Sequence, residues 1–148
     1  MCGIAGFCNF SGDNEKNIER MKQRMIHRGP DAGGTYLSED GAVVLGHRRL
    51  SIVDLSENGS QPMTSHSGRF VIVFNGEIYN YKKVADRLVS DKRVEAFRGS
   101  SDTEVLLEAF EAYGIEETIR MCKGMFAIAL YDKKEKTLYL LRDRVGEK

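Results

Sequence analysis

The sequence places a cysteine directly after the initiator methionine, in the stretch MCGIAGF. Methionine is commonly removed when the next residue is small, and Cys2 would then carry both a thiol and the free α-amine of the chain. The thiolate is the attacking species, and a thiol with a pKa of about 8.5 needs a base beside it. An α-amine titrates at about 7.7–8.0, so it can take that proton near neutral pH. Cys2 is therefore a candidate nucleophile with its own α-amine as the base.

Two other interpretations of Cys2 stay open on the residues alone. Free cysteines are often small, inert, buried hydrophobes, and one in an edge strand would do no chemistry. The other alternative is a Cys–His dyad with His27, His47 or His66, the three histidines of the chain. The rest of the sequence has to decide between them.

The other cysteines, Cys8 and Cys122, form no CxxC pair with Cys2 or with each other. Three scattered thiols do not make a disulfide framework, and the histidines show no ligand spacing with them, so no metal site is expected. Free thiols fit a reducing cytoplasm.

The composition is that of an ordinary globular domain. The 148 residues are 41% hydrophobic and 30% charged, and 22 basic residues balance 22 acidic ones. A formal net charge of zero argues against binding to nucleic acid or to a membrane surface through bulk charge. No apolar run reaches the roughly 18 residues of a membrane span, and the N-terminus does not look like a signal peptide.

The elements that must position these residues can be predicted from hydrophobic periodicity. Strands are expected over residues 4–10, 42–53, 69–75 and 94–97, and as a hairpin of residues 125–132 and 137–143. Helices are expected over residues 15–27 and 81–90, from a capping box at residues 101–104 to Gly114, and briefly after it. The segment RGPDAGG, residues 28–34, has the composition of a loop. This inventory predicts an α+β domain with largely antiparallel sheets.

A set of ordered motifs then points to one family. The chain contains, in order, MCGIAGF, HRGPD, LGHRRLSIVDLS, QPM, FNGEIYNY, SSDTEVLLEAF, GMFAIALYD and RDRVGEK. This set resembles the N-terminal glutaminase domain of glutamine-hydrolysing asparagine synthetases, a class II glutamine amidotransferase of the N-terminal nucleophile hydrolase group. The resemblance covers residues 1–148 and implies a four-layer αββα sandwich of two mainly antiparallel sheets, with the nucleophile at the end of an internal strand.

The resemblance also assigns the catalytic roles. Cys2 would attack the side-chain amide of L-glutamine, form a γ-glutamyl thioester and release ammonia. Asn75 and Gly76 match the oxyanion hole, which would use the Asn side-chain amide and the Gly backbone N–H. We expect the apolar strand FVIVFNG to break at this pair, and a plain Asn-Gly turn is the alternative.

Substrate binding is assigned in the same way. Arg49 matches the arginine that binds the α-carboxylate of glutamine, for which a planar guanidinium is suited. Arg48 should face the opposite way, because side chains alternate along a strand. Backbone groups of Leu50, Ser51, Ile52 and Val53 would lie beside the ligand, and Glu77 and Asp102 match positions near its α-ammonium. The HRGPD loop, His27 and His47 are expected to be structural.

The resemblance stops where the family continues into a synthetase domain. The pyrophosphate-loop motif S-G-G-x-D-S of that domain does not occur in the chain. We therefore expect no cofactor in this domain, ATP and Mg²⁺ only in a missing synthetase domain, and a longer protein from which this domain comes. The expected partners are L-glutamine and that C-terminal domain, a homodimer is left open, and the expected location is the cytoplasm. Glutaminase chemistry for another acceptor, such as a sugar or another carboxylate, and a catalytically silent scaffold are the alternatives.

Overall fold

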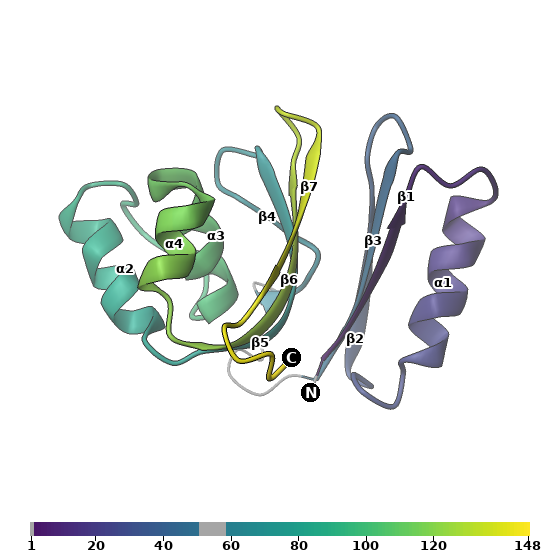
Figure 1. The fold of residues 1–148 in the computed structure, drawn as a ribbon, viewed down its shortest axis with the longest axis horizontal. Helices are drawn as coiled ribbons and strands as arrows, with labels where there is room; N and C mark the ends of the chain where they lie inside the picture. Colours follow the sequence, from purple (N-terminus) through teal and green to yellow (C-terminus); the bar gives the residue numbers. More distant parts are fainter. Residues whose placement is uncertain (1, 51–58) are drawn as a thin grey trace.

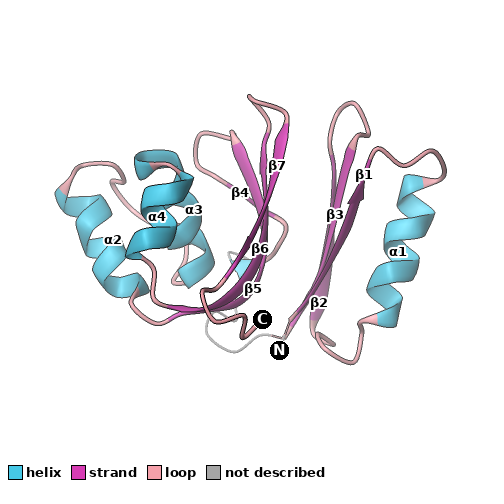
Figure 2. Ribbon diagram, in the orientation of Figure 1, coloured by secondary structure: helices cyan, strands magenta, loops and turns pink. Residues whose placement is uncertain are grey.

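The computed structural model describes residues 2–50 and 59–148. Two antiparallel sheets face each other, and helices cover their outer faces (Figure 1). One helix lies outside the first sheet and three lie outside the second, so the layers run helix, sheet, sheet, helix (Figure 2). The expected four-layer αββα sandwich of mainly antiparallel sheets is confirmed.

The first sheet has the strand order β1-β3-β2. Its strands are β1 (Gly3–Cys8), β2 (Ala32–Leu37) and β3 (Val43–Arg49), and α1 (Asn14–Arg24) covers its outer face. Asp13 caps α1 by accepting a hydrogen bond from the backbone N–H of Lys16 at 2.9 Å. Strand β1 is an edge strand of this described sheet, not the internal strand that the resemblance implies.

The second sheet has the order β4-β5-β6-β7. Its strands are β4 (Met63–Thr64), β5 (Phe70–Ile78), β6 (Gly124–Asp132) and β7 (Thr137–Arg142). The helices α2 (Tyr81–Ser90), α3 (Asp102–Tyr113) and α4 (Ile115–Met121) lie on its outer face. No helix in the described part of the chain is long and apolar enough to cross a membrane.

Alternation along the strands determines which residues fill each layer. One cluster lies between the sheets and contains Val43, Leu45, Val71, Val73, Ala129 and Tyr131. The opposite face of the second sheet packs on α3 through Phe70, Ile72, Phe74, Phe126, Leu106 and Phe110. In β3 the odd-numbered residues therefore face the second sheet, and in β5 the odd-numbered residues face the first sheet.

Several local predictions were wrong. Strand β2 begins at Ala32, inside the expected loop of residues 28–34, and residues 94–97 form no strand. Gly33 and Gly34 suggested a loop, but a Cβ on Gly33 would come within 2.9 Å of Arg48 Nη1, and one on Gly34 within 2.8 Å of Pro62 Cδ. These glycines accommodate close neighbours inside a strand.

The strand break expected at Asn75 and Gly76 is absent. Strand β5 does not break there but continues to Ile78, pairing Asn75 with Ala127 and Gly76 with Phe126. The turn interpretation of this dipeptide is therefore wrong as well. Glycine is required because a Cβ would collide with the carbonyl oxygen of Met125 on β6.

Candidate active site

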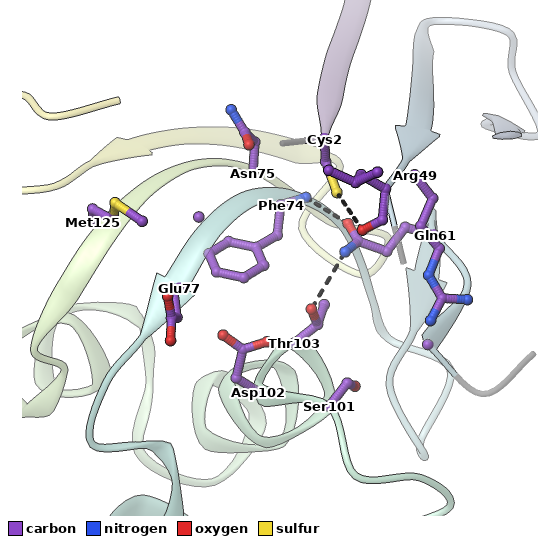
Figure 3. Close-up of a pocket in the computed structure, with 13 residues that line it drawn as sticks. Cys2, Arg49, Gln61, Phe74, Asn75, Glu77, Ser101, Asp102, Thr103 and Met125 are labelled. Carbon is purple, nitrogen blue, oxygen red and sulfur yellow. Dashed lines mark hydrogen bonds between the residues drawn. The ribbon is translucent and has the colours of Figure 1, made fainter. Parts of the chain in front are cut away.

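A cavity of about 260 Å³ lies at the end of the sandwich where β1 begins and β3 ends (Figure 3). Its lining comes from both sheets and from the start of α3. The lining residues are Cys2, Arg49, Leu50, Gly59, Gln61, Phe74, Asn75, Gly76, Glu77, Ser101, Asp102, Thr103 and Met125.

Cys2 lies directly before the first residue of β1. Its side chain is on the same side of the strand as Ile4, which packs into the cluster between the sheets. Its thiol donates a long hydrogen bond to the carbonyl oxygen of Leu50 at 3.8 Å. The guanidinium of Arg28 donates to the Cys2 carbonyl oxygen at 3.3 Å. The HRGPD loop thus holds the backbone of Cys2, and none of its residues lines the cavity.

The two neighbouring arginines of β3 take opposite directions. Arg49 is buried, lies on the odd-numbered face and lines the cavity. Arg48 turns to the other side, where its guanidinium donates to the carbonyl oxygens of Gly29 at 2.8 Å and Pro30 at 3.1 Å. The face expected for each arginine is therefore the one that each occupies.

Asn75 and Gly76 occupy the part of β5 that borders the cavity. Asn75 is odd-numbered, so its side chain lies on the face turned to the first sheet, where β1 starts. Gly76 has no side chain of its own, so it borders the cavity with its backbone. Both residues predicted for an oxyanion hole thus line the same cavity as Cys2.

Acidic groups lie across the cavity from the guanidinium of Arg49 (Figure 3). Asp102, in the first turn of α3, accepts a hydrogen bond from the backbone N–H of Ile78 at 2.9 Å. Burial raises the pKa of Asp102, the hydrogen bond from Ile78 opposes that rise, and the nearby charge of Glu77 adds to it. A cation placed between Glu77 and Asp102 would relieve this repulsion and lower the pKa of Asp102.

Three predicted substrate-binding residues, Ser51, Ile52 and Val53, lie outside the described residues. Leu50 is described and lines the cavity next to them.

No histidine lines the cavity as far as the chain is described. His47 is fully buried between the sheets, and neither ring nitrogen makes a well-formed hydrogen bond within the described chain. Burial lowers the pKa of His47 to about 4, the backbone of Phe74 opposes this and the charge of Arg49 reinforces it. A neutral buried imidazole away from the thiol does not support the Cys–His dyad.

Several lining residues have no role predicted from the sequence. Gln61 and Thr103 are the informative ones, because their side chains are buried and hydrogen-bonded to each other at 3.3 Å. Both stand in motifs quoted for the resemblance, QPM and SSDTE. What those motifs do not tell is that residues 42 positions apart meet at the cavity.

Comparison with known proteins agrees with this geometry. The glutamine amidotransferase domain model matches residues 1–148. The chain is 40% identical to asparagine synthetase [glutamine-hydrolyzing] 1 of Bacillus subtilis and 36% identical to amidase chry2 of Gibberella zeae, in each case over its whole length. It spans only 23% of the length of each of these two relatives.

The fold has a solved counterpart as well. Glutamine phosphoribosylpyrophosphate amidotransferase from Bacillus subtilis superposes with a TM-score of 0.68, covering 94% of this chain and 36% of that one, at 19% sequence identity. The two-sheet sandwich is therefore the fold of that amidotransferase. The chain belongs to the glutamine amidotransferase domain family.

Proposed function

We propose that residues 1–148 form a glutaminase domain that hydrolyses L-glutamine to glutamate and ammonia, with Cys2 as the nucleophile. The observation that carries this proposal is the cavity itself. It brings the second residue of the chain together with a buried arginine, Arg49, and with the carboxylates of Glu77 and Asp102. Free glutamine carries a carboxylate and an ammonium group on its α-carbon. The arginine complements the carboxylate, and the two acidic side chains complement the ammonium.

The substrate's orientation follows from this charge arrangement. Arg49 binds the α-carboxylate through its planar guanidinium, while Glu77 and Asp102 bind the α-ammonium. Both ends of the amino acid are then held, and the side-chain amide extends toward Cys2. Holding a substrate in this way replaces a bimolecular encounter by a positioned one.

The chemistry then proceeds in two halves. After removal of Met1, the α-amine of Cys2 takes the thiol proton, and the sulfur bonds to the amide carbon of glutamine. The carbon–nitrogen bond breaks, and the amine returns the proton to the leaving ammonia. Water then attacks the thioester and gives a proton to the amine. The carbon–sulfur bond breaks, glutamate leaves and the thiol is restored.

Each attack places negative charge on the former amide oxygen. Two donors that border the cavity suit this charge, the side-chain amide of Asn75 and the backbone N–H of Gly76. They belong to a paired strand, so they are in place before the charge develops.

The ammonia goes to an ATP-dependent synthetase domain of the asparagine synthetase type. The match to the Bacillus subtilis synthetase, of which the chain covers 23%, supports a covalently linked C-terminal partner. ATP and Mg²⁺ would act in that domain, and this one needs neither for thioester chemistry. We place the reaction in the cytoplasm, where the three free cysteines of the chain stay reduced.

A second acceptor is favoured by one observation. The chain is nearly as similar to amidase chry2 as to the bacterial synthetase, 36% against 40%. The same glutaminase chemistry could therefore serve an acceptor other than aspartate, and the sequence of the adjoining domain separates the two.

The test is to incubate the purified domain with glutamine and to measure glutamate and ammonia. We expect the two products in equal amounts, and no turnover by Cys2→Ala despite an unchanged fold. A wild-type domain that releases neither product would support the scaffold alternative, and turnover by Cys2→Ala would contradict the assigned nucleophile.

A further inference from the structure

The edge of β5 that faces the cavity is only partly covered by its neighbouring strand. Within the described chain, β4 pairs only with Val71 and Ile72, so no strand covers this edge of β5 beyond Ile72. Backbone N–H groups of alternate residues point to the same edge of a strand. Phe70 and Phe74 donate their N–H groups to Ser65 and Gln61, which flank β4 in the chain. Gly76 and Ile78 therefore direct their N–H groups to this edge as well.

Two of these three N–H groups are held by side chains. The Phe74 N–H donates to Gln61 Oε1 at 2.6 Å, and the Ile78 N–H donates to Asp102 Oδ2 at 2.9 Å. The N–H of Gly76 lies between them and faces the cavity that Gly76 lines. The edge of β5 is therefore fixed on both sides of the proposed oxyanion donor.

Gln61 also ties this edge to α3. Its Nε2 donates to the hydroxyl of Thr103 at 3.3 Å, next to Asp102 in the first turn of the helix (Figure 3). Gln61 is 8% exposed, and its amide bonds β5 through the oxygen and α3 through the nitrogen. A buried amide used in this way has a single orientation, because an exchange of its oxygen and nitrogen would face a donor with a donor.

We propose that Gln61 is a positioning residue for glutamine hydrolysis. By holding Phe74 it keeps the Gly76 N–H where negative charge develops on the amide oxygen, and it keeps Asp102 in register with the same strand. This inference rests on the proposed function. It adds a group that acts through the Phe74 N–H and sets the geometry of a donor that is used most strongly in the transition state.

The direct test replaces Gln61 by methionine, which has a similar length and volume but forms neither hydrogen bond. Removing an oxyanion donor outright costs about 10²–10³ in kcat, so a displaced donor should cost roughly 10- to 100-fold. Glutamine affinity, measured by calorimetry in a Cys2→Ala background, should change by less than about twofold, since ground-state binding uses Gly76 little. Amide hydrogen exchange at Phe74 should become faster, which reports the lost hydrogen bond without turnover.

The chain supplies matched controls. Gln23→Met on the exposed face of α1 should leave kcat, affinity and Phe74 exchange unchanged. Gln61→Glu keeps an acceptor for the Phe74 N–H and should retain more activity than Gln61→Met. Thr103→Val leaves the bond to Phe74 in place and should also lose less, which keeps the test usable if Gln61→Met folds poorly.

Two results would overturn the positioning role. One is wild-type kcat in Gln61→Met although Phe74 exchanges faster. The other is a parallel loss of affinity and kcat, which would indicate a general structural effect. Both are distinct from failure of the proposed function, in which the wild-type domain itself releases no glutamate.

Discussion

At the scale of single residues, the candidate site depends on the direction in which a side chain points more than on the residue type. Arg48 and Arg49 are chemically identical neighbours, yet one braces the loop at Gly29 and the other lines the cavity. Alternation along a strand explains this difference, so it could be predicted from sequence.

The two arginines give a first prediction. Arg49→Lys should weaken glutamine binding roughly 10- to 100-fold, because lysine replaces a two-point contact of about 1.5–3 kcal/mol by a point charge. Arg48→Lys should lower stability through its lost bonds to the loop but leave the glutamine affinity near wild type. Calorimetric titration of both variants in a Cys2→Ala background measures this, and equal losses at both positions would show that the carboxylate is held elsewhere.

The three thiols differ in environment, which gives a second prediction. A diazoketone analogue of glutamine should label Cys2 alone, because only Cys2 lies in the cavity. Cys122 is 1% exposed, and burial raises its pKa to about 11, so it carries almost no thiolate at neutral pH. Cys8 is exposed and serves as the internal control.

Peptide mapping decides the outcome. Glutamine should protect Cys2 from a small general alkylating agent and leave the labelling of Cys8 unchanged. Label from the glutamine analogue on Cys8 or Cys122 would contradict the assignment of Cys2.

His47 gives a pH-dependent prediction. Its pKa is lowered to about 4 in the folded protein, whereas an unfolded histidine titrates near its ordinary value of 6.5. The unfolded state therefore binds the proton first, and stability present above pH 6.5 is lost as the pH falls toward 4. The loss at pH 5 relative to pH 7 should be about 2 kcal/mol from this residue.

Urea unfolding at the two pH values measures this loss, and His47→Gln should remove most of it whatever its effect at pH 7. His27→Gln is the matched control at an exposed position and should leave the pH dependence as it is. An unchanged pH dependence in His47→Gln would mean that folding does not shift the pKa of His47.

At the scale of elements, periodicity predicted most of the inventory but misjudged the glycine-containing strands. Residues 81–90 form the expected helix, and Ser101 caps α3 by accepting from the Glu104 N–H at 3.2 Å. These signals are local, so the sequence contains them. Strand β2 and the end of β5 were missed because their glycines are needed for close contacts with residues distant in the chain. The predicted part of the site at residues 51–53 remains a prediction.

Gly76 provides a prediction at this scale. Gly76→Ala should destabilise the domain by about 1–3 kcal/mol. The added Cβ would meet the backbone of β6, including Phe126 Cα at 2.7 Å, and a paired strand cannot shift as a flexible side chain can. Gly3→Ala is the control, since its Cβ meets only the flexible side chain of Met25 at 3.2 Å. Chemical denaturation compares the two, and equal stabilities would contradict the close approach of β5 and β6.

At the scale of the whole molecule, the cavity exists because two sheets meet face to face. Cys2 and Arg49 come from the first sheet, while Asn75 and Gly76 come from the second. Neither sheet alone carries the proposed nucleophile together with the proposed oxyanion donors. Periodicity assigns each strand a buried face but does not say which faces meet, so the resemblance to a known family was needed to bring these residues together before the structure did.

The central claim is that the freed α-amine of Cys2 is the base for glutamine hydrolysis. The most direct measurement compares glutamate release by two forms of the same domain, one with Met1 removed and one with Met1 retained, with intact mass verifying each terminus. We expect turnover only in the form that begins at Cys2, because an amide nitrogen has no basicity to replace the amine. Full turnover with Met1 retained would contradict it.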